Sequence, residues 1–150
     1  MATQWPRVVA RLLTLLPTLP GWSAVAVYDG LPITLDTPTD YITVGYVANP
    51  NQVAGAYSTV QDPNGFQWAE TGTVESQLNC TTGDADLPGM RARAFALADA
   101  LDASVRADRT LGGTLSPAGT SELDVSVESL ENGAGTAMSL LLTLHYQTVT

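Results

Sequence analysis

The chain of 150 residues is long enough to bury a hydrophobic core as one domain. Hydrophobic residues make up 45% of it and charged residues 14%, which excludes an intrinsically disordered chain. The cations are six arginines with no lysine against fifteen carboxylates, and a net charge of −9 excludes a nucleic-acid-binding surface of clustered cations. The same charge suits a surface past which DNA moves, because a basic patch would hold the polymer.

The N-terminal segment predicts an amphipathic helix, because its apolar residues from Trp5 to Leu16 recur at helical spacing. Thr3 can cap this helix, Pro6 is tolerated in its first turn, and Pro17 ends it.

A secretory signal peptide is the alternative for this segment, since "LLTLLPTL" follows two arginines and "AVA" at 24–26 resembles a cleavage site. Arg11 cuts the apolar run to about eight residues, and Trp22 fits such a signal poorly, so we expect the helix to be kept. No run approaches the roughly 18 apolar residues that span a bilayer, and we expect no membrane partner.

Two strands and a long connection follow. Residues 23–30 ("SAVAVYDG") and 40–47 ("DYITVGYV") each predict a strand, the first ending in an Asp-Gly turn. Residues 48–65 are rich in proline and glycine and predict a loop or a long hairpin. Loops of this length are usually functional or disordered. A functional role is favoured here by three residues more apolar than a solvent loop requires: Val53, Tyr57 and Val60.

Residues 66–78 ("FQWAETGTVESQL") alternate between an aromatic and a polar face and predict a half-buried strand with a bulge or bend at Gly72. A second helix follows, with Asp84 or Asp86 as its cap and Asp102 and Arg106 as an i,i+4 pair. Its core-facing stripe is predicted to comprise Leu87, Met90, Ala94, Leu97, Ala98, Leu101 and Val105.

The C-terminal segment predicts two strands around "ENGAG" at 131–135, where Asn-Gly favours a tight turn. The final "HYQTVT" carries no acidic or basic protection, so we expect the last strand to be an exposed edge. The whole chain, 1–150, is thus predicted to be a single α+β domain: a largely antiparallel sheet with two helices packed on one face, plus a long protruding loop or hairpin.

Residue types that commonly carry chemistry are scarce. Cys80 is the only cysteine, which excludes an internal disulfide, and free cysteines usually pack as small hydrophobes. His145 is the only histidine and is expected to face outward or an interface, so any histidine-based metal site or triad would depend on it alone. We therefore expect no catalytic residue, no metal and no cofactor.

The stretch "RADRTLGGTLSPAG" at 106–119 poses a choice between a ligand-binding loop and a turn. A phosphate-binding loop follows a strand and precedes a helix, so that backbone amides and the helix dipole converge on the anion. Gly112 and Gly113 instead follow a helix and precede a strand, where glycine relieves a left-handed conformation. The sequence predicts a turn.

The order of these elements carries a resemblance. A leading helix ends in "LLPTLPG", the "DYITVGYV" strand and a polar hairpin follow, and an alanine-rich charged helix runs into "RADRTLGGTL" before a terminal strand pair. With the motif D-x-T-L-G-G at 108–113, the chain resembles the tail-terminator and tail-completion (neck) proteins of long-tailed, siphovirus-type phages of actinobacteria. Six arginines without lysine suit a high-GC genome of that kind.

The resemblance implies a structural virion protein without enzymatic activity. It implies a ring, usually of six copies, that ends growth of the tail tube and joins it to the head connector, at the head–tail junction of the virion after assembly in the host cytoplasm. The implied partners are further copies of the chain, the major tail tube protein and the connector or stopper protein, with genomic DNA passing through unbound. The candidate assembly contacts are Val53, Tyr57, Val60, His145 and Tyr146.

Two alternatives remain open at this stage. One is another neck component, a head-completion or stopper protein. The other is a small α+β ligand-binding domain or enzyme, in which acid and base would come from carboxylates: Asp36, Asp40, Glu70 and Glu75.

Overall fold

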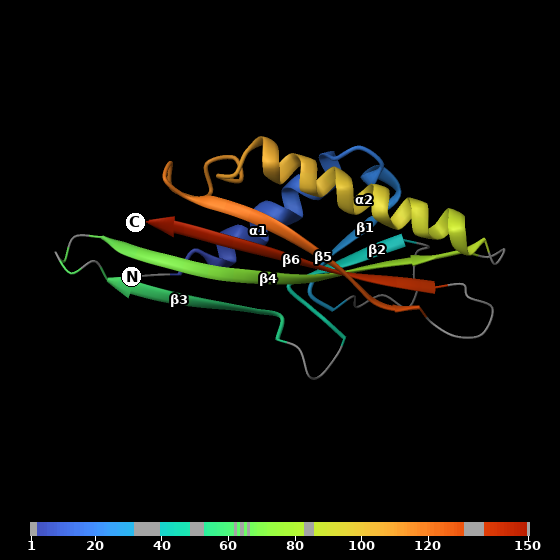
Figure 1. Cartoon of the computed structure of the whole chain (residues 1–150), viewed down its shortest axis with the longest axis horizontal. Coiled ribbons are helices and arrows are strands. Elements are labelled where there is room, and N and C mark those ends of the chain that lie inside the picture. The colour runs from blue at the N-terminus through green and yellow to red at the C-terminus, as the bar shows by residue number, and fades with distance from the viewer. Residues whose placement is uncertain are drawn as a thin grey trace.

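The computed structural model describes residues 3–31, 40–48, 53–61, 63, 65, 67–82, 86–130 and 137–149. Its α+β fold is the predicted one: a mixed sheet of six strands with two α-helices on one face (Figure 1). The helices are α1 (Trp5–Leu15) and α2 (Leu87–Ala107). The strands are β1 (Ala26–Asp29), β2 (Asp40–Val44), β3 (Gly55–Gln61), β4 (Trp68–Thr81), β5 (Thr120–Leu130) and β6 (Ala137–Val149).

Strand β4 organises the sheet because it is long enough to serve three neighbours. Its residues 69–81 pair with β6 along one edge. The opposite edge is shared, with β3 on residues 68–74 and β2 on residues 76–80. β5 follows β6, and β1 follows β2 as the one parallel strand pair among the described strands. Within 48–65, where the sequence predicts a loop or a long hairpin, residues 55–61 form β3 and pair antiparallel with residues 68–74 of β4, while residues 49–52, 62 and 64 lie outside the described part.

Helix α1 is amphipathic as expected, with Val8, Val9 and Leu12 buried. Pro6 lies in its first turn, where the missing amide hydrogen has no intrahelical partner to lose. Pro17 falls in a short 3-10 turn, Leu16–Thr18, that ends the helical segment. The predicted cap is displaced by one residue: Gln4 is the N-cap, and the Thr3 hydroxyl accepts from the Trp5 amide.

Helix α2 is capped by Asp86, whose carboxylate accepts a hydrogen bond from the Gly89 amide at 3.0 Å. The expected pair of Asp102 and Arg106 is present at 2.9 Å. Of the predicted stripe, Met90, Ala94, Leu97, Ala98, Leu101 and Val105 are buried, whereas Leu87 in the first turn is only partly buried.

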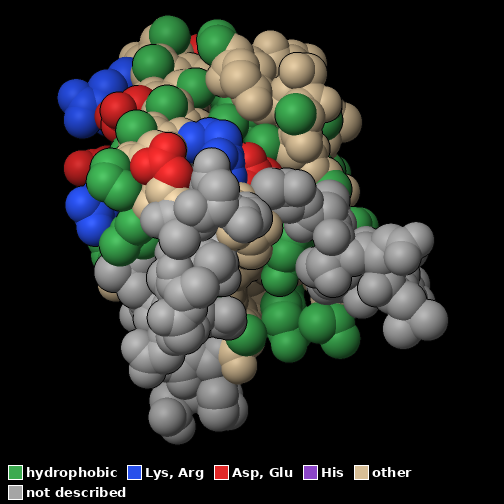
Figure 2. All heavy atoms as spheres, turned by 90° about the vertical axis from the view of Figure 1, so that its right-hand side faces the viewer, with side chains coloured by type: hydrophobic (Ala, Val, Ile, Leu, Met, Phe, Trp, Pro, Cys, Tyr) green, Lys and Arg blue, Asp and Glu red, His purple; other side chains and the backbone are tan. Residues whose placement is uncertain are grey.

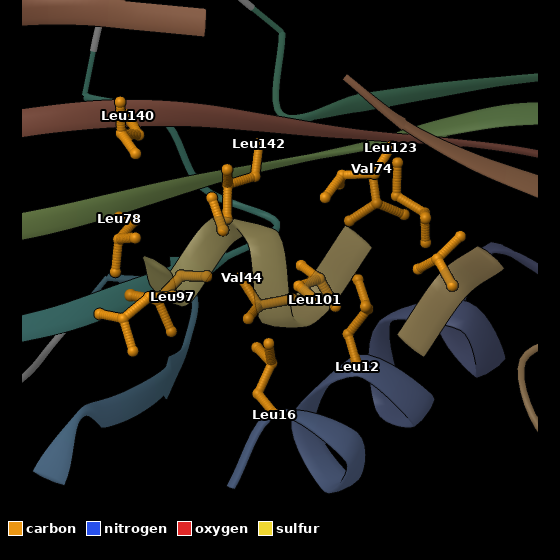
Figure 3. Close-up of a cluster of buried hydrophobic side chains, with 14 of the residues drawn as sticks. Leu12, Leu16, Val44, Val74, Leu78, Leu97, Leu101, Leu123, Leu140 and Leu142 are labelled. Atoms are coloured by element: carbon orange, nitrogen blue, oxygen red, sulfur yellow. The ribbon is translucent and has the colours of Figure 1, made fainter. Parts of the chain in front are cut away.

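The core lies between the helices and one face of the sheet (Figure 3). Even-numbered residues of β4 point into it, and Val74 and Leu78 have no exposed surface. Leu140 and Leu142 of β6 lie beside them, and side chains of the two helices, such as Leu12 and Leu101, pack against this face. The opposite sheet face, here called the open face, carries the odd-numbered residues of β4 and β6.

Two sequence predictions about the sheet are wrong. The pairing of β4 runs through Gly72 without a bulge; a Cβ there would meet the ring of Tyr146, so the glycine admits a close side chain. The last strand is not an edge, because β6 pairs with both β4 and β5, and residues 147 and 146 oppose Thr120 and Ser121. The predicted turn at 131–135, like Asp84, lies outside the described residues.

Truncating the core should test this packing. Leu101→Ala removes a side chain that is 3% exposed, and the expected loss in the free energy of unfolding is about 2–5 kcal/mol. Leu31→Ala, at a side chain 62% exposed, is the matched control and should change it by less than about 0.5 kcal/mol. Equal effects in urea unfolding would contradict the assignment of the core.

Candidate functional site

Strand β3 is the most exposed ordered element among the described residues. It pairs with β4 alone, and its residues from Ala56 to Gln61 are all exposed. Of the candidate assembly contacts, Val53 is 68% exposed, Tyr57 55% and Val60 64%. β3 contains no charged residue, so its free edge lacks the usual protection against pairing with another strand.

The contact between α1 and the sheet ends at the first residue of β3. The Trp5 indole donates to the Thr73 carbonyl at 2.8 Å and lies where a Cβ on Gly55 would stand. Only glycine therefore allows the chain to pass under Trp5. After Gly55, neither helix covers β3, and its apolar side chains Tyr57 and Val60 are exposed to solvent.

His145 lies on the open face of β6, with 46% of its side chain exposed. Its Nε2 atom is 2.8 Å from a carboxylate oxygen of Asp124 on β5. The prediction of an outward-facing histidine is confirmed.

The expectation that Tyr146 is an assembly contact is wrong, because this residue is 1% exposed. The alternation of β6 turns it toward the helices, and its ring packs against the helix-side surface of Gly72. Its hydroxyl donates to Glu70 at 2.7 Å, and burial together with this hydrogen bond raises the pKa of the phenol.

Glu70 is a buried carboxylate, 1% exposed, at the N-terminus of α1. It accepts hydrogen bonds from the Thr3 hydroxyl at 2.9 Å and from the Gln4 amide at 3.0 and 3.1 Å, besides that of Tyr146. A negative charge at a helix N-terminus is favourable because the amide groups and the helix dipole face it. Glu70 thus fixes α1 on β4. Alternation places Glu70 on the same face as Trp68 and Val74, and an acidic residue on that face is the one sequence signal of this role.

A hollow of about 440 Å³ lies on the open face where β3, β4, β6 and β5 run side by side. More of its exposed wall is apolar than polar, and hydroxyl-bearing side chains are common among the lining residues. His145 and Glu122 are the basic and acidic side chains of the open face in it. The lining residues are Ala56, Tyr57, Ser58, Thr71, Gly72, Thr73, Thr120, Ser121, Glu122, His145, Tyr146 and Gln147.

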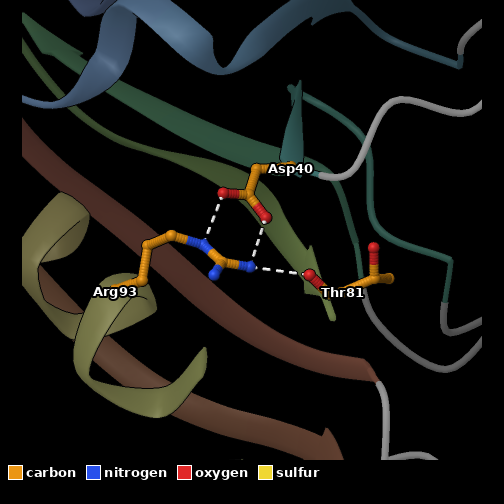
Figure 4. Close-up of polar contacts among 3 residues, drawn as sticks. All are labelled: Asp40, Thr81 and Arg93. Atoms are coloured by element: carbon orange, nitrogen blue, oxygen red, sulfur yellow. Dashed lines mark hydrogen bonds and ion pairs between the residues drawn. The ribbon is translucent and has the colours of Figure 1, made fainter. Parts of the chain in front are cut away.

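The carboxylates considered as an acid–base pair do not share a pocket where they are described. Asp40 accepts from Arg93 Nε at 2.7 Å and Nη2 at 3.0 Å, and Arg93 also donates to the Thr81 carbonyl (Figure 4). Glu75 accepts from the Thr143 hydroxyl at 2.7 Å on the open face. Asp36 lies outside the described residues.

Arg93 and Asp40 lie toward the end of the molecule at which α2 begins. Seen from that end, side chains of both charges lie side by side, with hydrophobic side chains among them (Figure 2). The bidentate geometry of Arg93 with Asp40 ties α2 to β2. The ion pair of Arg93 and Asp40 thus has a structural role, because it joins the helix to the sheet.

The double-glycine stretch is a turn, as predicted. Gly112 and Gly113 have φ angles of 67° and 81°, in the left-handed region. The Gly112 amide, which a phosphate would need, donates to Asp108 at 2.9 Å, and the Thr110 amide donates to the same carboxylate. The Thr110 hydroxyl and these amides lower the pKa of Asp108. The Asp108 carboxylate therefore occupies the amide groups that a bound phosphate would need.

Cys80 is fully buried, as expected of a small hydrophobe. Burial, and next the charge of Asp40, raise the pKa of its thiol to about 12. Across the described residues, no three or more His, Cys, Asp or Glu side chains gather as a metal site. No helix in that part of the chain has the length and apolarity needed to cross a membrane.

No known protein-family model matches the chain, and a search of the curated proteins finds no match.

The buried tyrosine offers a test of the polar junction. Tyr146→Phe removes the hydroxyl that donates to Glu70 and should lower the free energy of unfolding by about 1–3 kcal/mol. Tyr57→Phe, at an exposed ring, is the control and should stay within about 0.5 kcal/mol. Indistinguishable urea midpoints would contradict the role of Glu70.

The thiol predicts a dependence on pH. The folded protein keeps the Cys80 proton up to about pH 12, whereas the ordinary pKa is 9.0. The stabilisation that the thiol contributes is therefore complete below about pH 9 and is lost as the pH rises from 9 toward 12. The difference in unfolding free energy between the wild type and Cys80→Ala should shrink between pH 8 and pH 11. A difference that does not change with pH would refute this.

Proposed function

We propose that the protein is a ring-forming structural subunit that works as a tail terminator at the head–tail junction of a long-tailed phage. The observation that supports assembly is β3, an exposed, uncharged edge strand with Tyr57 and Val60 in solvent and with exposed Val53 just before it. An exposed apolar edge on a chain of this size favours a partner. A ring meets that need with one edge of each copy against a different surface of the next.

The charge distribution supports a channel. The six arginines lie in α1, α2 and the turn after α2. The open face instead carries carboxylates at Glu75, Glu122 and Asp124 among hydroxyl and amide groups. If this face lines the ring, DNA meets a negative wall and passes without binding. The assignment to the neck, and to six copies, follows the resemblance in element order and the D-x-T-L-G-G motif at 108–113.

The open-face hollow favours one other class of function, a ligand-binding domain. Its wall is apolar for the larger part, with hydroxyl groups among the apolar surface, which suits a small, largely apolar ligand that also carries hydrogen-bonding groups. A monodisperse monomer at high concentration that binds a small molecule in this hollow would favour that class over the ring. A head-completion or stopper protein is distinguished instead by its place in the neck, which a reconstruction of the virion shows.

Charge placed on β3 should block assembly while leaving the fold intact. Val53→Asp with Val60→Asp puts two carboxylates on the exposed strand and its approach, and particles should then show tails of abnormal length or unjoined heads. Ala92→Asp with Ala96→Asp, on the exposed side of α2, is the control with the same added charge and should assemble normally. Thermal unfolding of both variants should match the wild type. Normal particles from the β3 variant, or a virion reconstruction with the chain away from the head–tail junction, would reject the proposal.

A further inference from the structure

The sheet has two long free edges among its described strands, on β3 and on β5. On β3, the Ala54 carbonyl accepts from the Glu75 amide, so by alternation residues 55, 57, 59 and 61 turn their backbone groups away from β4. On β5, the Ser121 carbonyl accepts from Arg109, which places the odd-numbered residues toward the free edge. The Arg109 side chain therefore occupies the outward carbonyl of Ser121, and the edge available for pairing begins after that residue.

Strand direction makes these two edges complementary. β5, β6, β4 and β3 lie in this order across the sheet, and each neighbouring pair is antiparallel. β3 therefore runs opposite to β5. A second copy in the same orientation would set its β5 antiparallel against β3, and the alternation would continue without a break. The helices of both copies would then lie on the same side of one extended sheet.

The side chains on the two edges also match. Tyr57 is 55% exposed, Val125 38% and Val127 54%, and all three point to the helix side of the sheet. A register with Tyr57 opposite Val125 sets Gly55 opposite Val127 and pairs odd residues with odd ones. In this register, paired side chains point to the same face of the sheet, and the outward backbone N–H and C=O groups of the two strands face each other. An aromatic ring against a β-branched residue is a favourable cross-strand pair.

We propose that copies of this chain associate head to tail through antiparallel pairing of β3 in one copy with β5 in the next, with Tyr57 opposite Val125. This inference rests on the ring proposed above and names the two edges that would form it. The wall of the ring is then one continuous sheet, with the open face turned to one side and the helices to the other.

The required offset suits a closed sheet. Within one copy, Ser58 pairs with Thr71, Thr71 pairs with Gln147 and Gln147 pairs with Thr120, so Ser58 and Thr120 lie at the same level of the sheet. The proposed contact between copies instead sets Ser58 opposite Asp124. The shift of four residues is about 13 Å along the strands for about 19 Å across four of them. Strands would incline by about 35°, close to the tilt that closed sheets adopt. The register shift of β5 between Val127 and Ser129 falls just beyond the new pairing, where the strand must turn away from β1 of its neighbour.

Disulfide trapping tests the pairing. Ala56 and Ser126 would face each other at a non-hydrogen-bonded position, where the Cα atoms are about 4.5 Å apart and a disulfide fits. Under mild oxidation, a mixture of Ala56→Cys and Ser126→Cys proteins should give covalent dimers. The doubly substituted chain should give a ladder of higher multimers. Cys80 is buried, so the wild type should give neither product.

Matched controls decide the register and the symmetry. Ser58→Cys with Ser126→Cys is displaced by two residues and should link at least about tenfold more slowly. Equal rates, or no linkage of the first pair, would overturn the proposed pairing. Covalent dimers from Ala56→Cys alone would mean that β3 pairs with itself about a two-fold axis, and would also overturn it.

The outcomes separate this pairing from the function. A ring at the head–tail junction without this disulfide would refute the β3–β5 contact and leave the tail-terminator role standing. A ladder from a chain that a virion reconstruction places elsewhere would support the contact and reject the role.

Discussion

The length of β4 is the constraint on which the rest of the structure depends. Its fourteen residues offer two edges, and β6 fills one of them almost completely. The five residues of β2 pair with only part of the other edge, residues 76–80 of β4. The rest of that edge, residues 68–74, pairs with β3. The helices cover the β2 end of this edge and stop at Gly55, which leaves β3 as an exposed arm.

A buried carboxylate holds the boundary between the covered sheet and the arm. Glu70 gathers the Gln4 amide and the hydroxyls of Thr3 and Tyr146, so α1 begins directly above β4 at the level of β3. A buried charge is tolerated only when its hydrogen bonds are satisfied, and the helix N-terminus supplies what the strands cannot. The arm therefore adjoins a buried, hydrogen-bonded junction, which suits a surface that must present a fixed edge.

The two faces of the sheet differ in charge as well as in cover. Arginines accompany the helices, and one of them, Arg93, joins α2 to β2 through Asp40. The open face keeps carboxylates and hydroxyls, including the pair of His145 and Asp124. A protein that assembles through its edges can use such a sheet with the helices outside and a negative surface inside. The edges, the arm and the charge pattern together support the proposed ring.

The sequence by itself determined the element order, the α+β class, the buried stripe of α2 and the turn at Gly112, because each rests on local periodicity, capping or a backbone preference. It did not determine how strands share edges, since pairing joins residues more than sixty positions apart, as Glu70 and Thr148 are. Tertiary structure alone therefore decided that β6 is interior and that Tyr146 packs against Gly72. It also decided that β3, not the C-terminal strand, is the uncharged free edge. Alternation assigns a side chain to a face, but only the neighbours of a strand decide which of its edges and faces stay open.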